Sequence, residues 1–336
     1  MKALFEQICR ELSLGTMTGD PAPLSGGYTH RMFALTTTTG HYAVKLLNPE
    51  IMARPNAPGN YARAEDFERQ LEAAGLPILP AMTIGGKKMQ CVAGQYLYVF
   101  PYFEGRVLRD EEITPEHCAL MGCMLARIHG LSRRVFTHEA LLSEEGCPEG
   151  AGRSPDWPPL VAALLRNPES TAQGSDMHRA LPMLIRVTRA MEQAAAALPR
   201  VEALCHNDMD AKNVLWQGFD FRVIDLECLD WADPQQEMLD LAISWAGWPA
   251  DERRFKAFLA AYFAAGGEEP AQPDLLYDSR RNHLDWLAYN ARRALFEDAE
   301  ERRIGREQIE ETLAKIESDQ RQRETILRWM EEVSHE

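Results

Sequence analysis

Hydrophobic and polar positions alternate along much of the first hundred residues, which is the pattern of half-buried β-strands. The segment PLSGGYTHRMFALTTTTGHYAVKLL, residues 23–47, predicts two strands joined by a turn at Gly40. Residues 82–105 predict two further strands, again joined through glycine turns. Between the two pairs, the helical spacing of residues 61–74 predicts one helix.

The pattern becomes helical after residue 105. Thr114 followed by Pro115 has the order of a helix N-cap and first helical position, and predicts a helix over TPEHCALMGCMLARIHGLS. Residues 137–175 contain clusters of Gly, Pro, Ser and Glu and predict an exposed loop or insertion. Helices are expected again over residues 176–198 and 305–333.

These elements predict an α+β protein with a small β-rich lobe over residues 1–100 and a larger helical lobe over residues 101–336. A length of 336 residues and a hydrophobic content of 45% are sufficient for two such cores. The longest apolar runs are too short for a membrane-spanning helix. Seven cysteines without a CxxC pair favour free thiols in the cytoplasm.

The net charge of −15 argues against nucleic-acid binding, which requires basic surface for phosphate contacts. It fits a cationic small molecule weakly and fits an ordinary acidic protein better. Nothing in the sequence indicates an obligate protein partner or a membrane as partner.

The densest chemistry lies in CHNDMDAKNVLWQGFDFRVIDLE, residues 205–227. NVLW and FRVID are short apolar strands, and a hairpin between them brings Asn213 and Asp225 together at its outer ends. Two convergent oxygen ligands are suited to Mg²⁺, which takes its remaining ligands from phosphate and water. Asp208 precedes Asn213 by five residues, and Asp225 follows about a dozen residues later; this is the spacing that kinases use for a catalytic base and two metal ligands.

A bound triphosphate requires a cation and a backbone cover, and the first lobe offers a lysine and a glycine turn for these roles. Lys45 lies among apolar residues, where an ammonium needs a carboxylate or phosphate partner. Glu65 on the following helix is the favoured carboxylate, with Glu68 as the alternative. The backbone of the glycine turn can cover phosphate oxygens, although such a turn is also common as plain structure. It consists of Ser25, Gly26 and Gly27.

In this order the segments resemble the aminoglycoside phosphotransferase and choline kinase superfamily, the small-molecule branch of the protein-kinase-like fold. The resemblance spans roughly residues 20–325 and rests on SGGYTHRMF, YAVK, LYVFPYFEG, LMGCMLARIHGL, CHNDMDAKNVLW, VIDLE and QQEMLDLAISW. The chain has no Asp-Phe-Gly or Ala-Pro-Glu motif and no room for a long activation loop after Asp225. These departures argue against a protein kinase.

The resemblance implies a bilobal kinase fold that uses ATP, or GTP, with Mg²⁺. It implies that Asp208 is the catalytic base, that Asn213 and Asp225 hold the metal, and that Lys45 contacts the α- and β-phosphates. The backbone at Phe100 and Tyr102 would bind the purine. Glu227 would either assist the metal or stabilise local structure.

The acceptor implied by the resemblance is a small molecule with a hydroxyl group. An aminoglycoside-type antibiotic, and hence a role in antibiotic resistance, is favoured; a choline- or thiamine-like metabolite is the alternative, and a non-catalytic nucleotide-binding protein is a third possibility. Carboxylates would attract an amino-sugar, and aromatic rings would surround a quaternary ammonium. The candidate acceptor residues are Asp230, Glu237, Trp286 and Tyr289.

Overall fold

The computed structural model describes residues 1–24, 30–135 and 154–334. The chain forms two compact units. Unit 1 contains residues 1–112 and 204–231, and unit 2 contains residues 113–203 and 232–336. In the sequence-based division, by contrast, the first lobe ends at residue 100, and the expected catalytic loop, residues 205–216, belongs to the second lobe. No helix among the described residues combines the length and the apolar character that membrane crossing requires.

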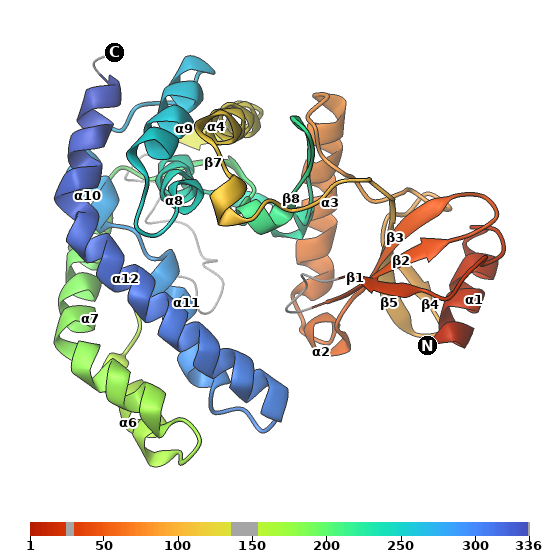
Figure 1. The fold of residues 1–336 in the computed structure, drawn as a ribbon, viewed down its shortest axis with the longest axis horizontal. Coiled ribbons are helices and arrows are strands. Elements are labelled where there is room, and N and C mark those ends of the chain that lie inside the picture. Colours follow the sequence, from red (N-terminus) through yellow and green to blue (C-terminus); the bar gives the residue numbers. More distant parts are fainter. Residues whose placement is uncertain (25–29, 136–153, 335–336) are drawn as a thin grey trace. The chain divides into compact units, whose positions relative to one another are not determined.

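Unit 1 is built on a five-stranded sheet with the strand order β1-β2-β3-β5-β4 (Figure 1). All of its neighbouring strands are antiparallel. The strands are β1 (Ala22–Leu24), β2 (Arg31–Thr36), β3 (His41–Leu46), β4 (Gln90–Val92) and β5 (Gln95–Pro101). The expected hairpins are therefore present, and β3 lies in the middle of the sheet.

The two faces of this sheet are covered by different helices. On one face, Phe5 and Ile8 of α1 (Lys2–Glu11) form a buried cluster with Val44 and other strand residues. On the other face, Tyr61 of α3 (Ala57–Ala73) packs in a cluster with Tyr98. The short helices α2 (Pro49–Met52) and η1 (Asp110–Glu112) complete the N-terminal part of this unit. Because side chains alternate along a strand, Lys45 lies on the α3 face, opposite Val44.

Residues 204–231 join unit 1 through backbone hydrogen bonds. This segment contains η2 (Ala211–Asn213), β8 (Val214–Gln217), β9 (Asp220–Val223) and η3 (Leu226–Cys228). The Val223 amide donates to the Pro77 carbonyl at 2.9 Å. Arg106 and Trp216 exchange two backbone bonds of 3.0 and 2.8 Å. These bonds explain why the catalytic loop belongs to unit 1.

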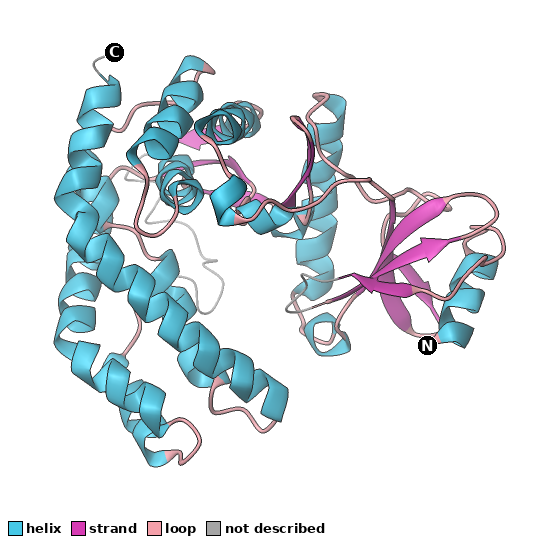
Figure 2. Ribbon diagram, viewed as in Figure 1, coloured by secondary structure: helices cyan, strands magenta, loops and turns pink. Residues whose placement is uncertain are grey.

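Unit 2 is mainly helical (Figure 2). Its helices are α4 (Pro115–His129), α6 (Trp157–Arg166), α7 (Thr171–Ala197), α8 (Pro234–Ala246), α9 (Glu252–Ala264), α10 (Pro273–Asp278), α11 (Asn282–Arg293) and α12 (Ala299–Ser334). Strand β6 (Arg133–Val135) pairs antiparallel with β7 (Val201–Cys205). Strands β7 and β10 (Asp230–Ala232) span the boundaries between the units.

Close backbone packing holds α4 against α9. A Cβ atom at Gly122 would lie 2.1 Å from the Phe258 carbonyl oxygen, so only glycine fits at this crossing. A second core joins α6 and α7 to α11 and α12 through large side chains such as Trp157, Leu184 and Leu287. Unit 2 therefore has an apolar core of its own.

Two sequence expectations differ from the structure. The pattern of the first residues predicts a helix over residues 1–18, whereas α1 ends at Glu11. Within the expected loop of residues 137–175, Trp157–Arg166 is a helix and α7 already begins at Thr171. Proline occurs in the first turn of α6, where it is compatible with a helix because its missing amide would be unpaired there anyway.

Candidate active site

Asp208 lies in the loop between β7 and β8, where two neighbouring side chains hold its carboxylate. Lys212 donates to Oδ1 at 2.6 Å, and the Asn213 side-chain amide donates to Oδ2 at 2.8 Å. Asn213 also donates to the Asp208 carbonyl at 2.7 Å, which fixes the loop. Burial raises the pKa of Asp208 above its ordinary value, and the Lys212 charge opposes part of that rise. The carboxylate is 29% exposed, so it remains accessible to a substrate hydroxyl.

The fully buried His206 supports this loop through both ring nitrogens. The Asp208 amide donates to Nδ1 at 3.3 Å, so the proton is on Nε2, which donates to the Ile224 carbonyl at 3.2 Å. His206 thereby joins the catalytic loop to the end of β9. This geometry agrees with an orienting role.

Asp225 follows β9 in the left-handed backbone region, with φ 62° and ψ 53°. This conformation is uncommon for a residue other than glycine and costs about 1–3 kcal/mol. The hairpin brings the ends together as expected, because the Ile224 amide donates to the Asn213 carbonyl at 2.9 Å. The strained turn therefore places the Asp225 carboxylate next to the catalytic loop.

Lys45 is bound to two carboxylates that both follow β9. Its Nζ lies 2.7 Å from Asp225 Oδ1 and also donates to Glu227 Oε1. The lysine side chain is 10% exposed, and burial lowers its pKa, but the charges of Glu227 and Asp225 outweigh burial and raise the pKa above its usual value. The Lys45 charge in turn keeps the pKa of Asp225 low despite burial. The site therefore keeps one cation between two anions.

The glutamates of α3 are bound elsewhere. Glu65, the favoured partner in the sequence analysis, accepts from the Tyr98 hydroxyl at 2.9 Å and from the Met89 amide at 3.2 Å. Glu68 accepts from Lys88 at 2.9 Å. The structure thus does not bring either glutamate to Lys45. Their local hydrogen bonds to strand and loop residues set the direction of both side chains.

His30 and Tyr61 belong to this network and were not expected from the sequence. The Asn48 amide donates to His30 Nδ1 at 3.0 Å, so Nε2 carries the proton and faces Glu227 Oε1 at 3.3 Å. The Tyr61 hydroxyl lies 3.3 Å from the same nitrogen. His30 was part of the quoted glycine-turn motif, but a single histidine in a loop gave no signal of its role.

The oxygen atoms at the end of the hairpin fit a divalent cation. Asn213 uses its amide nitrogen for Asp208, which leaves its side-chain oxygen as a candidate ligand. Asp225 and Glu227 add carboxylate oxygens. A set of amide and carboxylate oxygens matches the hard-ligand preference of Mg²⁺.

The remaining expected nucleotide contacts are only partly described. Ser25, Gly26 and Gly27 lie outside the described residues. Phe100 is in β5, paired with Ala43 of β3. The Tyr102 amide donates to the His41 carbonyl at 3.1 Å, and its ring stacks on His41 with centroids 3.9 Å apart. That amide is therefore already used within the sheet edge, and purine binding at this strand stays a prediction.

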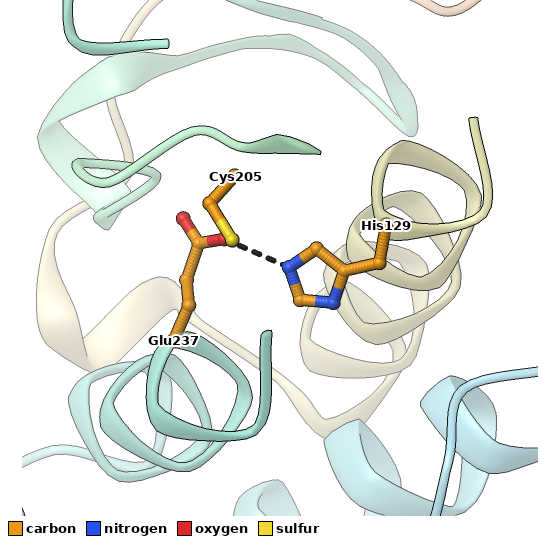
Figure 3. A group of neighbouring side chains, drawn as sticks. All are labelled: His129, Cys205 and Glu237. Carbon is orange, nitrogen blue, oxygen red and sulfur yellow. Dashed lines mark hydrogen bonds and ion pairs between the residues drawn. The ribbon is translucent and has the colours of Figure 1, made fainter. Parts of the chain in front are cut away.

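Both expected acceptor carboxylates, Asp230 and Glu237, have partners. Asp230 forms an ion pair with Arg63 at 2.9 Å, with both side chains partly exposed. Figure 3 shows Glu237 of α8 and His129 of α4 pointing toward each other, and also labels Cys205, the last residue of β7. His129 Nε2 lies 2.8 Å from the Glu237 carboxylate, and both side chains are buried. Glu237 therefore stabilises the packing of α4 and α8 rather than facing solvent.

The two expected aromatic residues form an exposed pair on α11. The rings of Trp286 and Tyr289 stack with centroids 5.5 Å apart and an interplanar angle of 22°. They are 41% and 36% exposed. The indole nitrogen of Trp286 donates to Gln308 at 3.0 Å. The pair thus presents aromatic surface to solvent and is not part of the core.

The protein has an α+β, protein-kinase-like fold. One unit is β-rich and contains the buried Lys45 and the loop of Asp208, and the other unit is helical. This combination is typical of a small-molecule kinase. The chain belongs to the phosphotransferase enzyme family, whose family model matches residues 20–276. This confirms the resemblance found in the sequence. A search of curated proteins finds no match to the chain.

Solved structures share the fold at low sequence identity. A spectinomycin phosphotransferase in complex with ADP and spectinomycin has a TM-score of 0.70 and 15% identity, covering 93% of this chain and 96% of that chain. An amicoumacin kinase in complex with AMP-PNP and Ca²⁺ has a TM-score of 0.60 and 13% identity, with 92% of each chain covered. A choline/ethanolamine kinase family protein from Mesorhizobium loti has a TM-score of 0.60 and 18% identity, covering 99% of this chain and 100% of that chain.

Proposed function

We propose that the protein transfers the γ-phosphoryl group of ATP, or GTP, to a hydroxyl group of a small cationic molecule, and that an aminoglycoside-type antibiotic is the acceptor. The observation that carries the proposal is the arrangement around Asp208. A partly exposed carboxylate, held on both oxygens by Lys212 and Asn213, lies in the same unit as Lys45 and Asp225. Phosphoryl transfer requires a base, a phosphate-binding cation and metal ligands around one nucleotide.

Asp208 is the proposed proton acceptor. Its Oδ1 and Oδ2 each have one donor, and each oxygen retains a lone pair for a substrate hydroxyl. Its raised pKa makes the carboxylate a better base than an ordinary aspartate. As the acceptor oxygen attacks, Asp208 takes the proton that this oxygen loses.

Lys45 is the proposed phosphate-binding cation. Its two carboxylate partners keep the ammonium charged in a buried position. Asn213 and Asp225, with Glu227 as an additional candidate, would hold Mg²⁺. When bound, the ion would neutralise charge on the phosphates. The two solved relatives whose complexes contain ADP or AMP-PNP support nucleotide binding by this fold.

The acceptor candidates are considered separately in each unit. In unit 2, Trp286 and Tyr289 offer exposed rings. In unit 1, Asp230 offers a carboxylate that is shared with Arg63. Glu237 is not retained as a candidate because it is buried against His129. The net charge of −15 favours a cationic acceptor, and antibiotic resistance would be its physiological role. A cytoplasmic location is part of the proposal, since none of the described cysteines is in a disulfide.

A choline- or thiamine-like acceptor is the second candidate. The stacked, exposed rings of Trp286 and Tyr289 favour it, because aromatic faces attract quaternary ammonium groups. The relative from Mesorhizobium loti, described as a choline/ethanolamine kinase family protein, supports the same alternative.

A coupled assay of nucleoside-diphosphate release tests the proposal. ATP and GTP are each supplied with Mg²⁺ against a panel of aminoglycosides, choline, ethanolamine and thiamine. We expect release that depends on an aminoglycoside. Release that depends only on choline or thiamine selects the second candidate. Nucleotide binding without release for any acceptor would support a non-catalytic protein and contradict the proposal.

A further inference from the structure

Unit 2 contains a cavity of about 240 Å³ whose walls are unusually rich in charge. Its lining residues come from α7, α8, α10, α11 and α12 and the turn between α10 and α11. The charged groups are Arg186, Asp240, Asp278, Arg280, Asp319 and Arg323. Three arginines and three aspartates around one small space are costly to desolvate unless each has a partner.

Arg280 is the central group of this cavity. Its side chain is 8% exposed, and its guanidinium lies over the Tyr277 ring at 4.6 Å. Nε donates to Asp240 at 2.8 Å and Nη2 donates to Asp319 at 2.5 Å. Nη1 is buried and has no acceptor among the described residues. A guanidinium has five donors, so this arrangement leaves donor capacity for an oxygen atom.

The two carboxylates beside Arg280 carry more negative charge than this one guanidinium neutralises. Asp240 and Asp319 share Arg280, and their other contacts come from the Asn282 amide at 2.5 Å and the His283 ring at 3.0 Å. Asn282 is neutral and adds no positive charge. Asp240 and Asp319 can therefore accept hydrogen bonds from one more cationic donor.

The other arginines differ in how they are paired. Arg323 forms two bonds of 2.6 Å to Asp278, so this pair is already satisfied. Arg186 lines the cavity from α7, is exposed, and forms no ion pair among the described residues. The cavity thus offers a free guanidinium at its rim and an excess of carboxylate at its centre.

We propose that this cavity binds a small zwitterion of amino-acid size, with its carboxylate toward Arg186 and its ammonium toward Asp240 and Asp319. Arginine suits a carboxylate because its planar fork matches two oxygens. The volume is below the range of about 300–1,000 Å³ that is usual for drug-sized ligands. A polycation would be repelled by the three arginines that line the cavity. The proposed site is separate from the phosphoryl transfer proposed above and does not depend on it.

Calorimetric titration of the full chain without nucleotide tests the proposal with three matched probes. L-Serine carries both charges, 3-hydroxypropionate lacks the ammonium, and ethanolamine lacks the carboxylate. We expect L-serine to bind at least about tenfold more tightly than either single-charge probe, because it alone satisfies both groups. Equal or tighter binding of ethanolamine, or no measurable binding of L-serine, would overturn the proposal.

Variants locate the binding site. Arg186→Ala is expected to weaken L-serine binding by about tenfold without lowering the melting temperature, because the side chain is exposed. Arg189→Ala is the matched control, since Arg189 is exposed on the same helix but does not line the cavity. If both variants bind L-serine alike, the assignment to this cavity is wrong.

Discussion

Replacing Glu227 by glutamine tests whether this residue, rather than a glutamate of α3, is the partner of Lys45. In the structure Lys45 contacts Asp225 at 2.7 Å and also contacts Glu227, while Glu65 is bound to Tyr98. If Asp225 is to turn toward a metal ion, Glu227 must keep Lys45 in place. With glutamine at position 227, Asp225 becomes the main partner of Lys45 and is less available to the metal.

The expected magnitude follows from the type of bond that is lost. A hydrogen bond to a charged group contributes about 1.5–3 kcal/mol and a neutral one about 0.5–1.5 kcal/mol, so the substitution costs about 1–2 kcal/mol. Because 1.4 kcal/mol corresponds to about a tenfold change in affinity, Glu227→Gln is expected to weaken Mg²⁺-dependent ATP binding by about 5- to 30-fold.

The assay is titration of a fluorescent ATP analogue in the presence of Mg²⁺, which requires no knowledge of the acceptor. Glu65→Gln is the matched control, because the new amide oxygen can still accept from Tyr98 and Met89. We expect this control to bind the analogue within about twofold of the unchanged protein. Weak binding by Glu65→Gln together with normal binding by Glu227→Gln would refute the reasoning.

Three further predictions concern positioning, packing and pH. As a single substitution, His30→Phe is expected to lower kcat by about tenfold, because His30 faces Glu227. When Glu227→Gln is already present, His30→Phe is expected to cause no further loss. An equal loss of kcat in both cases would contradict this prediction. Gly122→Ala is expected to lower the free energy of unfolding by about 1–3 kcal/mol in a urea titration, because its Cβ would meet the Phe258 carbonyl oxygen at 2.1 Å. Burial raises the pKa of Asp319, but Arg280 and His283 outweigh it and hold the pKa below the ordinary value. The stability that Asp319 adds is therefore full above about pH 4 and is lost as the pH falls through its folded-state pKa. Asp319→Asn should cost about 1–3 kcal/mol at pH 7, and a difference that failed to shrink in acid would contradict this assignment.

The sequence was sufficient to predict the elements that follow a regular pattern. Alternating residues predicted β2 and β3, and the apolar runs NVLW and FRVID predicted a hairpin that brings Asn213 and Asp225 together. These features depend on neighbours that are close along the chain. The loop that carries Asp208 could therefore be located before any three-dimensional information.

The partner of Lys45 could not be predicted in the same way. It depends on where Glu65 and Glu227 point, and contacts that are distant in sequence determine this: Tyr98 binds Glu65, and His30 faces Glu227. The helix α6 was also missed. Its two prolines, Pro158 and Pro159, directly follow the Gly- and Pro-rich segment, and its burial around Trp157 depends on packing with α7 and other helices of unit 2.

Transfer of labelled phosphate from ATP to the acceptor found in the panel is the most direct test of the central claim, which is that Asp208 is the base of a small-molecule kinase. The comparison needs the unchanged protein, Asp208→Ala, and Asp220→Ala as a control for an exposed carboxylate in the neighbouring hairpin. We predict that Asp208→Ala loses transfer by at least about 100-fold while its nucleotide affinity stays within about threefold, and that Asp220→Ala transfers normally. Transfer by Asp208→Ala at the rate of the unchanged protein would contradict the account.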